Sequence, residues 1–147
     1  MLASLAQHLE EPERCLAVYL DFQGQQHLDM PGFCRVLSER LREEAGDRVP
    51  LEVASDLSEL NDLMGQLHRA GLRLVCLFDE FETVTRSPAF GPEFYGALRS
   101  LASVFSLALV TASRQSLQTL CHSQEISESP FFNIFAETRL GAMPDDE

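Results

Sequence analysis

The sequence predicts an α/β protein with a mainly parallel sheet in a three-layer α/β/α arrangement. Three short apolar runs, at residues 15–22, 72–78 and 105–110, alternate with stretches whose apolar residues recur at helical spacing. This alternation builds βαβ units, in which parallel strands are buried on both faces. Polar or charged residues follow each apolar run, so they are expected at the carboxyl edge of the sheet, where open α/β sheets bind ligands.

The first half of the chain is expected to hold three helices and one strand. Leu2, Leu5, Ala6 and Leu9 share a helical face, and the helix predicted over residues 1–11 starts without a capping sequence, as if its beginning were missing. The other elements are a strand at 15–22, a helix at 30–45 with Pro31 in its first turn, a loop at 45–50, and a helix capped by Ser55 or Asp56 that ends at Gly71.

The second half continues the alternation. Its expected elements, in chain order, are a strand at 72–78, a short helical turn and loop at 81–91, a helix from Glu93 to Val104, a strand at 105–110, a short helix at 116–121, a polar loop at 123–129, an apolar turn at 130–135, and a short fourth strand at 136–140. No linker or internal repeat divides the 147 residues, so we expect a single domain over residues 1–147.

Composition excludes several classes of function. A net charge of −12 argues against a broad nucleic-acid-binding face, and no apolar run is long enough to cross a membrane, so a cytoplasmic location is expected. The four cysteines and four histidines lie far apart, without the spacing of a zinc site, which favours buried, reduced thiols. All 11 basic residues are arginines. Chemistry that needs a lysine, including that of the P-loop lysine, therefore cannot be completed by this sequence.

Two adjacent carboxylates, Asp79 and Glu80, end the apolar run at 72–78. Neighbouring carboxylates repel one another unless a cation or a proton relieves them. One interpretation is a Walker B element, in which Asp79 holds Mg²⁺ and Glu80 polarises the water that attacks a γ-phosphate. The alternative is a strand end that meets solvent, followed by an acidic helix N-terminus.

The other two strand ends also carry polar groups. Thr111 and Ser113 follow the run at 105–110, and either hydroxyl suits the position that senses the γ-phosphate beside the Asp-Glu pair. Arg114 could stabilise charge there, although a surface arginine after a strand is commonplace. Asp21 could assist a metal site or simply serve as a turn residue.

Three stretches resemble P-loop ATPases of the AAA-like and STAND type, which are related to archaeal and origin-recognition ATPases. They are LVCLFDEFE at 74–82, LALVTASR at 107–114 and SPFFNIFAETRLG at 129–141. The resemblance implies a P-loop NTPase-like fold, ATP and Mg²⁺ as cofactors, Asp79 as the Mg²⁺ residue, Glu80 as the catalytic base, and Thr111 or Ser113 as the sensor. It makes residues 1–147 one partial AAA-like ATPase core.

The sequence departs from this family in its missing phosphate loop. No G-K-[ST] segment is present, and the family's first strand and lid are also missing, so no cofactor-binding residue is assigned. We therefore expect an incomplete core from a truncated gene, a mis-assigned start or a split protein, which binds nucleotide when a longer chain completes it and does not hydrolyse ATP alone.

The expected function is that of an ATPase-like domain in a nucleotide-dependent signalling or assembly protein with a protein partner. The alternative is a non-catalytic interaction domain that keeps the fold. A phosphoacceptor receiver domain, with Asp79 as acceptor and Thr111 as switch hydroxyl, is disfavoured because such domains use a lysine.

Overall fold

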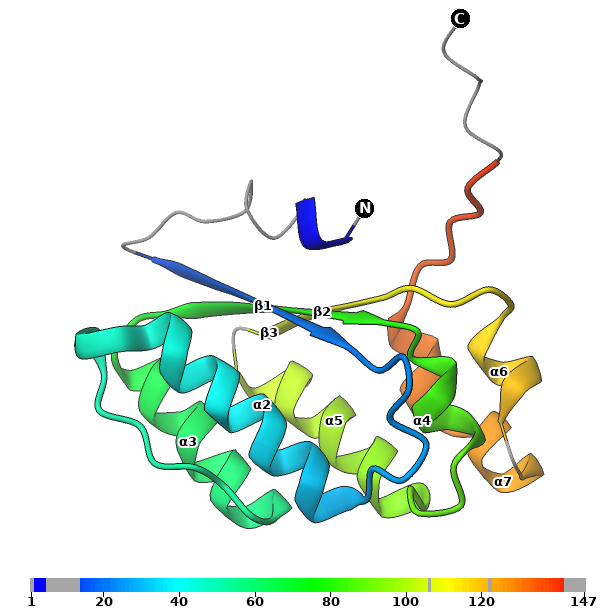
Figure 1. The fold of residues 1–147 in the computed structure, drawn as a ribbon, viewed down its shortest axis with the longest axis horizontal. Helices are drawn as coiled ribbons and strands as arrows, with labels where there is room; N and C mark the ends of the chain where they lie inside the picture. Colours follow the sequence, from blue (N-terminus) through cyan, green and yellow to red (C-terminus); the bar gives the residue numbers. More distant parts are fainter. Residues whose placement is uncertain (1, 5–13, 106, 122, 142–147) are drawn as a thin grey trace, which may run out of the picture.

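A sheet of three parallel strands forms the centre of the protein. The computed structural model describes residues 2–4, 14–105, 107–121 and 123–141. The strands are β1 (Cys15–Asp21), β2 (Arg73–Asp79) and β3 (Leu107–Thr111), and β2 lies between the other two (Figure 1). Asp21 pairs with Asp79 and Phe78 pairs with Thr111, so all three strands end at one edge. This arrangement confirms the predicted parallel α/β sheet.

Three long helices cover one face of the sheet. They are α2 (Met30–Ala45), α3 (Leu57–Arg69) and α5 (Pro92–Val104), and all three lie below the sheet in Figure 1. Asp29 and Asp56 cap the first two, since each carboxylate accepts a backbone N–H of the first turn, from Gly32 and Glu59 respectively, at 2.8 Å. Residues 2–4 are helical and lie on the other side of the sheet, so helical segments flank both faces.

The middle strand is buried on both of its faces. Side chains that alternate along β1 and β2 join the core between the sheet and the three long helices, among them Val18, Cys76 and Phe78. The intervening residues Ala17 and Leu77 point to the opposite face and are buried as well. This double burial explains why the sequence of β2 is an almost unbroken apolar run.

A chain of aromatic rings runs through the core beneath the strand ends. Phe22, Phe78 and Phe81 contact one another at centroid distances of 5.5–5.9 Å, and Phe33 connects them to Phe94 at 4.8 Å. The chain continues through Tyr95 to Phe131 and Phe132 in the short 3₁₀ helix η2 (Pro130–Ile134). The aromatic residues of the distinctive C-terminal stretch are therefore part of the core.

Short helices follow the strand ends: α4 (Glu82–Arg86), α6 (Leu117–Leu120) and α7 (Gln124–Ser127), with the 3₁₀ helix η1 (Gly46–Arg48) after α2. The prediction of a simple polar loop at 123–129 was wrong, because Ser123 caps α7 by accepting the N–H of Ile126 at 3.4 Å.

The predicted fourth strand at 136–140 was also wrong. Residues 136–140 have no strand pairing and are all exposed. The segment Ala-Glu-Thr-Arg-Leu has no alternation of apolar residues, so neither of its faces could be buried in a sheet. The helix predicted over residues 1–11 lies outside the described residues except for residues 2–4. In the part of the chain that is described, no helix has the length and apolar character needed to span a membrane.

Candidate functional site at the carboxyl ends of the strands

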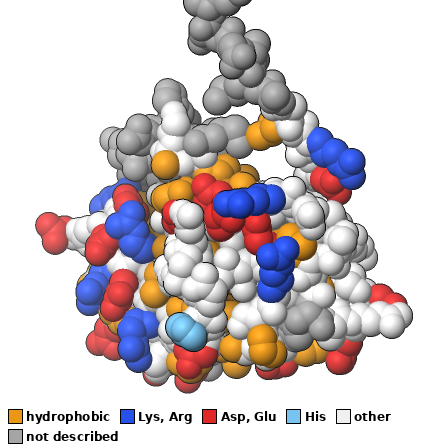
Figure 2. Space-filling view, turned by 45° about the vertical axis from the view of Figure 1, so that its right-hand side comes forward, with side chains coloured by type: hydrophobic (Ala, Val, Ile, Leu, Met, Phe, Trp, Pro, Cys, Tyr) orange, Lys and Arg blue, Asp and Glu red, His pale blue; other side chains and the backbone are white. Residues whose placement is uncertain are grey.

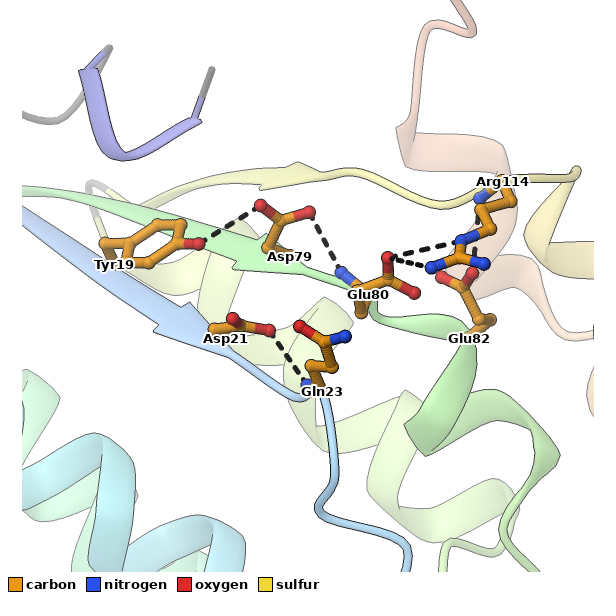
Figure 3. Close-up of polar contacts among 7 residues, drawn as sticks. All are labelled: Tyr19, Asp21, Gln23, Asp79, Glu80, Glu82 and Arg114. Carbon is orange, nitrogen blue, oxygen red and sulfur yellow. Dashed lines mark hydrogen bonds and ion pairs between the residues drawn. The ribbon is translucent and has the colours of Figure 1, made fainter.

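Asp79 is the last residue of β2, and hydrogen bonds hold its carboxylate on both oxygens (Figure 3). Oδ2 accepts the hydroxyl of Tyr19 at 3.1 Å, and Oδ1 accepts the backbone N–H of Glu80 at 3.1 Å. Tyr19 lies on the neighbouring strand β1, and its hydroxyl points at the carboxylate. Burial, and then the hydrogen bond to Asp79, raise the pKa of Tyr19.

Glu80 turns the chain from β2 into α4 through a left-handed backbone conformation. Its φ is 51°, which makes it the only described residue other than glycine with a positive φ. Such a conformation costs a non-glycine residue about 1–2 kcal/mol and is often found at functional sites. Glu80 Oε1 accepts Arg114 Nη2 at 3.1 Å and Nε at 3.3 Å. The turn thus directs Glu80 towards the segment that follows β3.

Glu82 is a buried carboxylate that the sequence analysis did not single out. It is the first residue of α4, and its side chain is almost fully buried, with 6% of the residue's surface exposed. Oε1 accepts the backbone N–H of Arg114 at 3.2 Å, whereas Oε2 is buried without a hydrogen-bond partner. The sequence marks Glu82 only by its position directly after a phenylalanine, Phe81. The structure shows that Phe81 is fully buried.

The end of β3 lies beside the Asp-Glu segment, as the sequence predicts. Ala112 donates its N–H to the carbonyl of Phe78 at 2.8 Å and accepts the N–H of Phe81 at 3.2 Å. Thr111 pairs with Phe78, so its side chain leaves the sheet on the helix-covered face, opposite to that of Asp79.

Neither predicted sensor hydroxyl contacts the carboxylate pair within the described structure. The Ser113 hydroxyl donates to the carbonyl of Gln115 at 2.6 Å. Thr111 is half-buried on the other face of the sheet. The structure therefore brings the backbone of this segment to the site, whereas the two hydroxyls point elsewhere.

Asp21 forms a turn beside the site. Its Oδ1 accepts the N–H of Gln23 at 2.8 Å, and its side chain is exposed. Asp21 therefore serves as a turn residue, which is one of the two roles that the sequence allows for it. No cluster of three or more His, Cys, Asp or Glu side chains suited to a metal occurs among the described residues. A single carboxylate such as that of Asp79 is compatible with Mg²⁺ at a nucleotide site. At such sites one or two carboxylates bind the ion, and waters and phosphate oxygens complete its coordination.

Charges of both signs gather where the strands end. Figure 2 shows acidic side chains near the centre of this face, with arginine side chains across and below them. Asp21, Asp79, Glu80 and Glu82 contribute four carboxylates, and Arg114 contributes one guanidinium. This excess of negative charge suits a divalent cation, and it would repel a polyphosphate that arrived without one.

The parallel sheet, the acidic pair at the end of its middle strand and the adjoining tip of β3 define an NTPase-like domain related to STAND and AAA-like P-loop ATPases. The chain belongs to the family described as Novel STAND NTPase 2, which matches residues 33–147. The resemblance inferred from the three sequence stretches is thereby confirmed.

A solved structure of similar fold is that of the ORC2 protein of Aeropyrum pernix, described in ADPNP-ADP complexes. It has 16% sequence identity and a TM-score of 0.57, over 80% of this chain and 30% of the archaeal chain. At this identity the likeness establishes the fold alone. No curated protein sequence matches the chain.

Proposed function

We propose that this chain is a nucleotide-responsive domain in which Asp79 holds the Mg²⁺ of a bound ATP and Glu80 polarises the attacking water. The observation that supports the proposal is the placement of both carboxylates at the end of the middle strand, with Asp79 oriented by two donors and Glu80 turned by a strained backbone. Carboxylates at this position of an α/β sheet face the crevice where ligands bind.

Asp79 suits a cation held through water. Each of its oxygens already accepts one hydrogen bond, and a carboxylate oxygen has two lone pairs, so each oxygen retains one further acceptor position. Water molecules of a hydrated Mg²⁺ can use these positions without displacing Tyr19. Mg²⁺ loses its hydration shell reluctantly, which favours this mode of binding. When bound, the ion would neutralise charge on the nucleotide phosphates.

The Glu80 oxygen that faces Arg114 becomes available to water only when their ion pair opens. Both Nε and Nη2 of Arg114 donate to Glu80 Oε1, and these two hydrogen bonds occupy the acceptor positions of that oxygen. The Arg114 side chain is 76% exposed, so the pair contributes little stability and opens at low cost. In this proposal Thr111 or Ser113 senses the γ-phosphate.

The groups that bind the β- and γ-phosphates must come from another polypeptide segment. The 147 residues contain no lysine and therefore no G-x-x-x-x-G-K-[ST] segment, whereas P-loop proteins hold the β- and γ-phosphates through this loop and its lysine. We therefore propose weak nucleotide binding and no ATP hydrolysis by this chain alone, in the cytoplasm, with a longer chain or a protein partner that completes the site.

A paramagnetic titration tests the metal role on the chain as it exists. Mn²⁺ added with ATP should broaden the ¹⁵N–¹H resonances of residues around Asp79, and Asp79→Asn should abolish this effect. Asp47→Asn, which removes one exposed carboxylate in η1, serves as the control and should leave the broadening unchanged.

Three results would contradict the proposal. Equal broadening in Asp79→Asn would show that Asp79 does not hold the metal ion. Tight binding of Mg-ATP by this chain would show that it binds the phosphates without a P-loop. No metal-dependent change at all would favour the alternative, a non-catalytic interaction domain.

A further inference from the structure

We infer that Glu82 is a positioning residue that fixes Arg114 against the Asp79–Glu80 segment. The inference rests on the proposed function, because it concerns the same site, and it depends on geometry that can be tested without nucleotide. Glu82 lies at the start of α4, and its Oε1 accepts the backbone N–H of Arg114 at 3.2 Å, across 32 positions of sequence.

The direction of this carboxylate is unusual for its place in a helix. An acidic residue in a first turn ordinarily faces the unpaired N–H groups of its own helix or points into solvent. Glu82 instead points inward, with 6% of its surface exposed, and it bonds to a segment that follows another strand. Its contact therefore joins two parts of the site rather than capping α4.

Glu82 holds the backbone at Arg114, which lies beyond the last residue of β3 that takes part in backbone pairing. Ala112 is held by its own bonds to Phe78 and Phe81. Two residues later, Arg114 has no such pairing among the contacts described, and its backbone N–H bonds to Glu82. The guanidinium of the same residue pairs with Glu80. Arg114 is thus held at both ends by carboxylates two positions apart.

Packing alone does not account for a carboxylate at this position. Oε2 is buried without a partner, and a buried acceptor left unsatisfied destabilises the folded state. An apolar side chain of similar volume would avoid that cost, and it is often neutral or stabilising in place of a buried charge. What such a side chain cannot provide is an acceptor for the N–H of Arg114.

Amide hydrogen exchange on the full chain separates positioning from general stability. Glu82→Gln keeps an oxygen that can accept the N–H, whereas Glu82→Met has similar length and no comparable acceptor. In Glu82→Met, exchange of the Arg114 amide should accelerate about tenfold, while exchange of the Ala112 amide stays the same after correction for global stability. Glu82→Gln should stay within about threefold of the unsubstituted chain at both amides.

Other outcomes would overturn the inference. An unchanged Arg114 amide in Glu82→Met, or equal acceleration at Ala112, would assign Glu82 a merely structural role. If Glu82→Met does not fold, the unsubstituted chain still tests the contact. NMR should detect a scalar coupling across the hydrogen bond, between the Arg114 amide nitrogen and the Glu82 carboxyl carbon. Absence of this coupling would refute the contact. Failure of the Mn²⁺ titration at Asp79 would leave these results unaffected, so the two proposals fail separately.

Discussion

The backbone strain at Glu80 can be measured by comparing alanine with glycine at that position. Both substitutions remove the carboxylate and its ion pair with Arg114, so this loss cancels between them. At a φ of 51°, alanine bears the left-handed cost of about 1–2 kcal/mol, which glycine avoids. Glycine loses about 0.5–1 kcal/mol more in backbone entropy on folding. Glu80→Gly should therefore be more stable than Glu80→Ala by about 0.5–1 kcal/mol.

The matched control is an exposed residue within a regular helix. Arg35 lies in the middle of α2, where glycine should be less stable than alanine by about 1 kcal/mol. The sign of the alanine-to-glycine difference should thus reverse between positions 35 and 80. Urea unfolding followed by circular dichroism gives all four free energies of unfolding. If glycine is the less stable residue at position 80 as well, the backbone there is not left-handed in solution and the description of the turn is wrong.

Three further predictions concern the core and the site. Tyr19→Phe should lower the free energy of unfolding by about 1 kcal/mol because Asp79 loses a hydrogen bond; urea unfolding checks this, and no loss would place the hydroxyl in water. Phe33→Ala should lower it by about 3–5 kcal/mol, because that ring is fully buried among other rings; a loss under about 1 kcal/mol would contradict this packing. Burial raises the pKa of Cys76 from 9.0 to about 12. The unfolded chain therefore loses this proton at lower pH than the folded chain, so the contribution of this thiol to the free energy of unfolding is constant below pH 9 and falls as the pH rises towards 12. From about pH 8 to 10.5, unfolding measurements should show Cys76→Ala losing about 2 kcal/mol less than the unsubstituted chain, and equal losses would mean that the thiol is exposed.

The strands and long helices were predictable because their apolar residues repeat with a clear period. The strand expected over 72–78 is observed as Arg73–Asp79, and the helix expected over 30–45 is observed with those bounds. The third strand begins at Leu107 rather than residue 105, since Phe105 caps the end of α5. The errors fall where the periodic signal is weak, at 123–129 and 136–140, in which local capping and the lack of a buried face decide the structure.

The candidate site was predictable only in its strand-end residues. Asp79 and Glu80 follow an apolar run, and this pattern is visible in the sequence. The contacts of Tyr19 and Glu82 depend on strand register and on pairs 60 and 32 positions apart, which no local pattern encodes. The partnership of Arg114 with Glu80 likewise follows from the fold, since a surface arginine after a strand is uninformative by itself.

The aromatic chain beneath the strand ends determines which side of the site can rearrange. Phe78 and Phe81 flank Asp79 and Glu80 in the sequence, and both rings pack among other buried rings. Moving the acidic pair by even a small distance would open a void in close-packed interior. Arg114, by contrast, is exposed and lies beyond the last backbone pairing of β3. A ligand-driven change at this edge would thus leave the carboxylates stationary and displace the guanidinium.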